Sequence, residues 1–161
     1  MRTRKLAPML VLGAFLAAAC DGTVMSVGTP TTPSVESASF SVMPSTLAAQ
    51  RTTTTFCPSV PPFSVPLTLF VRAGSVSVVV TEISMRFVDS FGVQMPQVTL
   101  PAPVLTAQFG TALVEARSGR SFPLTLGVGC GTGSTGTIII IVQGRDGQGH
   151  TSSTQVTAIV R

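Results

Sequence analysis

Three cysteines and one histidine are the side chains with the widest chemistry in this 161-residue chain: Cys20, Cys57, Cys130 and His150. A structural zinc site takes four ligands, and the cysteines show no C-x-x-C spacing. A cysteine nucleophile needs a histidine base, but His150 follows a glycine-rich stretch with no catalytic signature. We therefore expect no metal site, no catalytic thiol and no small-molecule cofactor.

A hydrolytic triad is the second chemistry to consider, because His150 lies close in sequence to Asp146, Ser152 and Ser153. The chain has no G-x-S-x-G element, and neighbours within one turn do not by themselves have triad geometry. We interpret His150 as an exposed turn residue. The other acids are scattered, which argues against a calcium loop or a carboxylate pair. They are Asp21, Glu36, Glu82, Asp89 (expected in a turn) and Glu115.

Two further patterns suggest anion binding. Residues 131–136 read G-x-G-x-x-G, but a dinucleotide site needs a helix after that motif, and here an isoleucine-rich strand is expected. We interpret it as a loop between strands. Arg117 and Arg120 flank Ser118-Gly119 and could hold an anion, although a solvated turn is the favoured interpretation.

The first nineteen residues have the organisation of a secretory signal. Arg2, Arg4 and Lys5 precede an uncharged apolar run, Leu6–Ala19. As a helix, that run would span roughly 21 Å, short of the ~30 Å hydrocarbon core of a bilayer. A permanent membrane span is therefore not expected, and residues 1–19 are predicted to be removed.

Leu16-Ala17-Ala18-Ala19-Cys20 resembles the lipobox of bacterial lipoproteins. The resemblance implies cleavage before Cys20, a lipid on its thiol, and attachment to a membrane of the bacterial cell envelope. The pattern departs from the family at Ala17, where leucine is usual. Ordinary cleavage at the A-x-A sequence remains the alternative. Asp21, the residue directly after the cysteine, does not decide whether the inner or the outer membrane carries the protein.

Removing the signal changes the charge argument. The whole chain carries a formal net charge of +4. Three of its ten basic residues lie in the signal, which leaves seven arginines against six acids. The mature protein is nearly neutral, so no nucleic-acid partner is expected.

If Cys20 carries lipid, Cys57 and Cys130 are the remaining pair. Secretion into an oxidising compartment favours a disulfide between them. Such a bond would close a loop of about 74 residues, which the chain-entropy estimate values at roughly 4–5 kcal/mol.

The chain after Cys20 divides into a tether and a folded region. Residues 20–37 are rich in Ser, Thr, Pro and Gly, which indicates a flexible tether. Residues 38–161 have the size of a single domain. No window shows helical periodicity, and short segments with alternating or continuous apolar residues predict strands. These are Ala38–Met43, Thr52–Phe56, Ser64–Arg72, Val76–Asp89, Gln97–Leu100, Thr111–Val114, Ser121–Val128, Thr137–Gln143 and Thr151–Val160.

Within Val76–Asp89 the alternating apolar face changes phase at Thr81-Glu82, which predicts a β-bulge or a bend between sheets. The closing segment, IIIIVQGRDGQGHTSSTQVTAIV, resembles the last two strands of bacterial immunoglobulin-like and fibronectin-type domains. We therefore expect an all-β fold, an antiparallel immunoglobulin-like β-sandwich of about 7–9 strands. Cys57 precedes a strand and Cys130 lies in a loop, so the bridge should pin loops at one end rather than cross the core.

These features describe a lipid-anchored envelope protein, on the periplasmic or the surface-exposed side, with a non-catalytic binding or structural module. Few acids and one histidine leave little for catalysis. An envelope hydrolase with an unrecognised site is the alternative. Besides the membrane, the expected partner is an envelope protein, bound by loops at the bridged end or by an exposed edge strand. Thr52–Phe56 and Thr151–Val160 are the predicted edges.

Overall fold

The computed structural model describes residues 37–53, 55–57 and 59–161. The predictions for the signal peptide, Cys20 and nearly all of the tether therefore lie outside the described residues. In the described part of the chain, no helix has the length and apolar character needed to cross a membrane.

The described region is built mainly from β-strands, with one short helix. The strands are β1 (Ser39–Met43), β2 (Thr46–Leu47), β3 (Gln50–Arg51), β4 (Phe63–Arg72), β5 (Val78–Asp89), β6 (Val98–Pro101), β7 (Leu113–Val114), β8 (Gly119–Val128), β9 (Gly136–Asp146) and β10 (Thr151–Val160), and the helix is α1 (Ala102–Phe109). The predicted β class is confirmed, and the predicted boundaries of the last strand match the structure.

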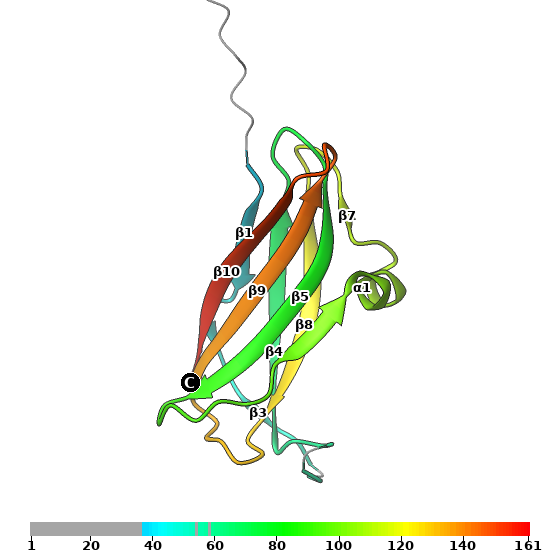
Figure 1. The fold of residues 1–161 in the computed structure, drawn as a ribbon. Coiled ribbons are helices and arrows are strands. Elements are labelled where there is room, and N and C mark those ends of the chain that lie inside the picture. Colours follow the sequence, from blue (N-terminus) through cyan, green and yellow to red (C-terminus); the bar gives the residue numbers. More distant parts are fainter. Residues whose placement is uncertain (1–36, 54, 58) are drawn as a thin grey trace, which may run out of the picture. The chain divides into compact units, whose positions relative to one another are not determined.

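The strands form two sheets that lie face to face (Figure 1). In the first sheet, β4 is central, with β8 along one side and β1 and β3 along the other. The second sheet has the order β2-β10-β9-β5-β6, and β7 also pairs with β5. All pairs are antiparallel except β2 with β10, which is parallel. The second sheet is therefore mixed, which corrects the expectation of a purely antiparallel fold.

Period-two alternation explains why the long strands form and how they pack. In β4, Val65, Leu67, Leu69 and Val71 are buried, and the even-numbered residues of β8 from Phe122 to Val128 are buried opposite them. Both sheets contribute to one hydrophobic cluster. Its largest fully buried side chains are Leu47, Val65, Leu69, Val71, Val80, Ile83, Met85, Phe87, Leu105, Phe122, Ile138 and Ile140.

Strand β5 contains the predicted irregularity. Its pairing with β9 shifts register between Val80 and Glu82, so that Thr81 is the extra residue. Val78 and Val80 are buried before the shift, and Ile83 and Phe87 are buried after it. Because one extra residue inverts the alternation, the bulge keeps both halves of the strand facing the core.

Pro66 is tolerated in the central strand β4 because neither β1 nor β3 pairs with β4 at this position. Strand β1 pairs with β4 as far as Thr68, and β3 pairs with it again from Ser64. Between them the chain crosses to the other sheet as β2. No described strand therefore faces Pro66 on that side, where a missing N–H would otherwise break a ladder.

The helix α1 was not predicted. It begins after Pro101 with a proline in its first turn and ends at Gly110, whose N–H donates to the Thr106 carbonyl at 2.9 Å. Within these eight residues only Leu105 is buried. One buried position gives no periodicity to detect, so the expectation of a helix-free domain was wrong.

The predicted strand Thr52–Phe56 is also wrong. The strand in this region, β3, covers only Gln50–Arg51, and Phe56 pairs with Val60 in an isolated bridge. Thr52 extends the β3 pairing by one hydrogen bond, from its N–H to the Pro62 carbonyl at 3.0 Å. Pro61 and Pro62 have no N–H to donate, so the ladder cannot continue.

Candidate binding surface at the disulfide end

Cys57 and Cys130 form a disulfide, with an S–S distance of 2.04 Å and a Cα–Cα distance of 5.6 Å. Cys57 lies between β3 and β4, and Cys130 lies between β8 and β9. The bond therefore joins two loops at one end of the domain and does not cross the core, which agrees with the pairing predicted from the sequence.

The bridged end lies opposite the point where the folded region begins. Strand β4 starts at Phe63, close to the bridge, and runs to Arg72, which pairs with Ser39 at the start of β1. Ten extended residues span roughly 33 Å. Ser37, the first described residue, lies beside His150 and Thr151 at that opposite end.

Asp89 connects a third loop, between β5 and β6, to the β8–β9 loop that carries Cys130. Its side chain is only 6% exposed, and its Oδ1 accepts hydrogen bonds from the N–H groups of Phe91 (2.9 Å) and Val93 (2.8 Å). Its Oδ2 accepts a third from the Gly133 N–H at 2.9 Å. The Gly133 hydrogen bond, with the others, holds the pKa of Asp89 below its ordinary value despite burial. The β5–β6 loop is thereby tied to the β8–β9 loop.

Two phenylalanine rings project from these loops into solvent. Phe56 is 73% exposed and Phe91 is 87% exposed, and Val60 and Val93 beside them are also exposed. The three loops at this end, residues 52–62, 90–97 and 129–135, contain no charged residue in the sequence. These loops are therefore uncharged and have apolar tips, while the exposed side chains of Arg51 and Arg161 lie at the same end of the domain.

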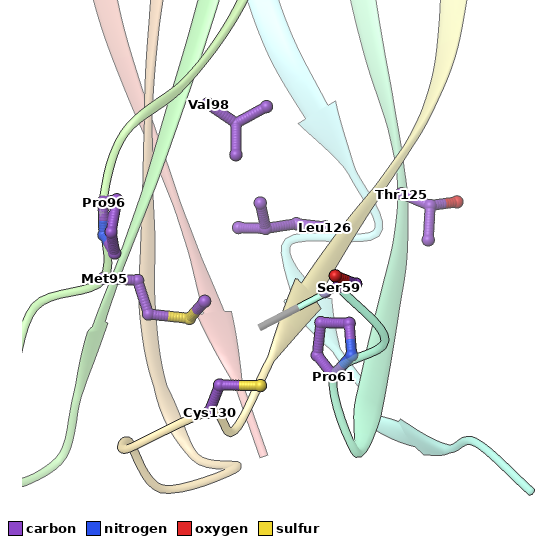
Figure 2. A pocket seen from close by; sticks show the side chains of 9 residues that line it. Ser59, Pro61, Met95, Pro96, Val98, Thr125, Leu126 and Cys130 are labelled. Carbon is purple, nitrogen blue, oxygen red and sulfur yellow. The ribbon is translucent and has the colours of Figure 1, made fainter. Parts of the chain in front are cut away.

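An apolar cleft opens between the edges of the two sheets at the same end, with a volume of about 510 Å³ (Figure 2). Met95, Pro96 and Val98 lie on one side of it, and Pro61 and Leu126 on the other, with Cys130 at its lower end. Apolar walls with few polar groups suit an apolar side chain of a partner better than a charged ligand.

At the opposite end the structure brings Asp146 and His150 together. The His150 Nδ1 lies 3.0 Å from the Asp146 Oδ2, and the Asp146 Oδ1 accepts hydrogen bonds from the N–H groups of Gln148 and His150. The side-chain hydrogen bond with His150 lowers the pKa of Asp146. The ring of His150 is exposed, as expected from its position in the turn.

The contact itself was not predicted, because the closeness of His150 and Asp146 in sequence was interpreted only as part of an exposed turn. The Asp-Gly pair in the sequence did indicate part of this arrangement, because the side chain of an Asp that starts such a turn accepts hydrogen bonds from backbone N–H groups a few residues further on. Ser152 lines the same small hollow as His150. No hydrogen bond joins His150 to a serine within the described region.

The residues considered for anion binding either have structural roles or do not come together in a site. Arg120 donates from its Nη2 to the Phe109 carbonyl at 2.7 Å and lies over the Phe122 ring, so it secures the end of α1 rather than an anion. Arg117 is exposed in the turn before β8. The G-x-G-x-x-G segment leads into strand β9, and its Gly133 N–H binds Asp89.

In residues 37–161, leaving aside positions 54 and 58, no three His, Cys, Asp or Glu side chains gather closely enough to hold an ion.

The structure is a two-sheet β-domain whose loops are joined to one another at one end. Comparisons with known proteins give information about the fold of this domain and about nothing else. Neither known protein families nor curated proteins show a match to the sequence. Among solved structures, the structural genomics target SoR45 is 10% identical with a TM-score of 0.56, over 76% of this chain and 86% of that one.

Two other structures align more loosely. The putative ApaA protein from Bordetella pertussis is 15% identical with a TM-score of 0.48, over 78% of this chain and 97% of that one. The sporulation control protein Spo0M from Bacillus subtilis is 11% identical with a TM-score of 0.36, over 79% of this chain and 49% of that one. The likeness to SoR45 shows a shared fold and carries no activity or ligand to this chain.

Proposed function

We propose that this chain is a membrane-anchored lipoprotein of the bacterial cell envelope whose folded region is a non-catalytic, immunoglobulin-like binding module. The strand pairing supports the immunoglobulin-like class. The first two strands of the described region lie in different sheets, β1 beside β4 and β2 beside β10. Strand β4 also pairs with β8, and β9 lies between β5 and β10. Immunoglobulin-type sandwiches have two sheets of this kind.

The anchor is proposed from the sequence. A basic and then apolar N-terminus ending in Ala17-Ala18-Ala19-Cys20 resembles a lipoprotein signal. A disulfide between the two remaining cysteines is compatible with an oxidising compartment such as the periplasm or the cell surface.

One observation carries the binding function: the uncharged loops of the disulfide end, with the exposed rings of Phe56 and Phe91, lie opposite the end where the tether joins. Both rings project from loops that are attached to the same third loop, residues 129–135, and exposed apolar groups on such a surface are candidate interaction sites. A flexible tether from a lipid at Cys20 would leave this end free to meet an envelope protein. The absence of tryptophan and tyrosine favours a protein over a glycan as the ligand.

The binding function is tested by removing both rings. Phe56→Ala with Phe91→Ala should reduce recovery of a specific envelope partner, after cross-linking in intact cells, by roughly tenfold or more, as for truncation of interface hot spots. Val104→Ala, which trims an exposed apolar side chain on α1, is the matched control and should leave recovery unchanged. Equal recovery with both variants would remove the disulfide end from the binding function.

The anchor is tested by metabolic labelling with radioactive fatty acid. Label should enter the wild-type protein and be absent from Cys20→Ser, because the thiol that carries the lipid is gone. Label in both proteins, or in neither, would refute lipidation at Cys20.

A hydrolase is the second candidate, favoured by the 3.0 Å contact between Asp146 and His150 beside Ser152. An aspartate that orients a histidine is the arrangement of a general base. The binding proposal expects no turnover of ester, peptide or glycan substrates by the purified protein. Turnover that His150→Ala abolishes would establish the hydrolase instead.

A further inference from the structure

Strand β10 has an open edge in the described structure. It pairs with β9 along all ten of its residues. On its other side, β2 pairs only with Ile159 and Val160. The edge from Thr151 to Ala158 has no hydrogen-bonded partner strand among the described residues, although β1 of the other sheet lies beside β10 (Figure 1).

Two hydrogen bonds reveal which backbone groups face outward. At the start of the β9–β10 hairpin, the Asp146 N–H donates to the His150 carbonyl at 2.9 Å, so even-numbered residues of β10 bond to β9. At the far end, the Ile159 N–H donates to the Ser45 carbonyl at 3.2 Å, so odd-numbered residues face the open side. The N–H and C=O groups of four exposed residues therefore point outward: Thr151, Ser153, Gln155 and Thr157.

This edge lacks the features that usually prevent strand addition, which are charges, prolines and bulges. Residues 151–160 contain no charged residue, no proline and no glycine. In the other sheet, the outer strand β8 contains Arg120, Pro123 and Gly127, and the outer strands on its opposite side are short, with five residues in β1 and two in β3. The other outer strand of the second sheet, β6, has only four residues and ends at Pro101. Among these outer strands, β10 has the longest edge without such features.

We propose that the β10 edge pairs antiparallel with β10 of a second copy of this chain, across a two-fold axis at Thr154. In this register Thr151 lies opposite Thr157 of the other copy, and Ser153 lies opposite Gln155. All four outward residues of each copy then meet outward residues, which allows about eight hydrogen bonds, two for each pair. A register shifted toward the C-terminus would bring the second copy against β2 at Ile159.

The edge is complementary to itself, which favours a second copy over a foreign strand. The facing side chains are threonine, serine and glutamine, so no like charges meet across the axis. A two-fold interface requires one surface that fits its own copy, and the uncharged edge has no charge pattern that would select a different partner. The paired surface is small, so the dimer is weak and depends on concentration.

The proposed lipid anchor is compatible with this dimer, and this step alone rests on the proposed function. Antiparallel pairing displaces the Ser37 ends of the two copies by about 20 Å, six residues of strand. Each tether from Cys20 to Glu36 has a contour of roughly 55–60 Å. Both copies can therefore be anchored in one membrane, where confinement raises their effective concentration.

The register is tested by cysteine cross-linking of the full chain in the membranes of the producing cell. Thr154→Cys places the two thiols opposite each other at a non-hydrogen-bonded pair, where Cα atoms lie about 4.5 Å apart, within disulfide range. We expect a disulfide-linked dimer at least tenfold more abundant than with Thr125→Cys, an exposed position on β8, or with the wild type. Equal dimer in all three would overturn the proposal.

A proline substitution tests whether the edge itself is responsible. Gln155→Pro, added to Thr154→Cys, removes an outward N–H that β9 does not use, so the domain should still fold, which thermal unfolding checks. The cross-linked dimer should fall at least tenfold. Thr125→Pro in the same background is the matched control and should leave the dimer unchanged. Undiminished cross-linking in a folded Gln155→Pro variant would contradict pairing through β10.

Discussion

At the scale of single residues, Asp89 shows how one side chain organises a surface. Its carboxylate replaces the water that three backbone N–H groups would otherwise need, and two of its donors, Val93 and Gly133, lie in different loops. These hydrogen bonds stabilise the ionised form, which is why its pKa is lowered. Asp146 has the same property through its contact with His150.

We predict that acid weakens the domain through these carboxylates. Because the pKa of Asp89 is lower in the folded protein, its stabilising effect is complete above the unfolded value of about 3.9. The effect is lost as the pH falls below that value and through the folded pKa. Asp89→Asn should lower the unfolding temperature at neutral pH, since an amide N–H would face the Gly133 N–H, and should flatten the decline below about pH 4.

Thermal unfolding from pH 2 to pH 7 measures this difference. Glu115→Gln, which changes an exposed acid, is the control and should follow the wild-type curve. A variant at Asp89 that kept the full wild-type decline would show that other groups cause the acid sensitivity.

At the scale of elements, the bulge in β5 decides which side chains enter the core. Val80 and Ile83 are both fully buried although they are three residues apart, which regular alternation does not allow. The extra residue Thr81 corrects the phase. Because the bulge lies within the pairing of β5 with β9, both halves of β5 stay in the sheet and both bury their apolar side chains.

Deleting Thr81 should therefore prevent stable folding. One half of β5 would face the wrong way, exposing side chains such as Ile83, Met85 and Phe87, each worth about 1.5–3 kcal/mol of burial. Their sum rivals the total stability of a small domain, about 5–15 kcal/mol. Loss of the cooperative unfolding transition is the expected result, and Thr81→Ser is the control that keeps the residue count. A deletion variant that unfolds like the wild type would show that the bulge can move.

At the scale of the whole molecule, the domain has three distinct regions. The chain enters at the end that carries Asp146 and His150, and the disulfide, the Asp89 contacts and the exposed Phe56 and Phe91 are at the other end. The open edge of β10 runs along the side. The two ends and the β10 edge are therefore separate surfaces of the domain.

The disulfide links the two halves of the chain, so its loss should affect the whole domain. Replacing both Cys57 and Cys130 by serine frees a loop whose ends are 73 residues apart in sequence and should lower the free energy of unfolding by about 2–5 kcal/mol. Chemical denaturation of the variant and of the wild type in oxidised form measures the change. The reduced wild type should resemble the variant, and equal stability of all three forms would mean that the bond contributes nothing.

Local patterns in the sequence were sufficient for the long strands. Alternation in Ser64–Arg72 and Thr151–Val160 and the change of phase at Thr81 depend only on neighbours along the chain, and the structure contains all three features. The predictions failed where a segment is short or depends on its surroundings. Helix α1 buries one leucine, and the strand expected at Thr52–Phe56 lacks partners because prolines lie opposite it.

The sequence by itself determined the features that need no fold: the charged and apolar halves of the N-terminus, the small residues before Cys20, and the spare pair of cysteines. The tertiary structure decided which distant groups meet. Asp89 and Gly133 are 44 residues apart, and nothing local in either segment indicates their contact. The open side of β10 likewise depends on where β2 ends its pairing, because the order of strands in a sheet comes from long-range contacts and not from local periodicity.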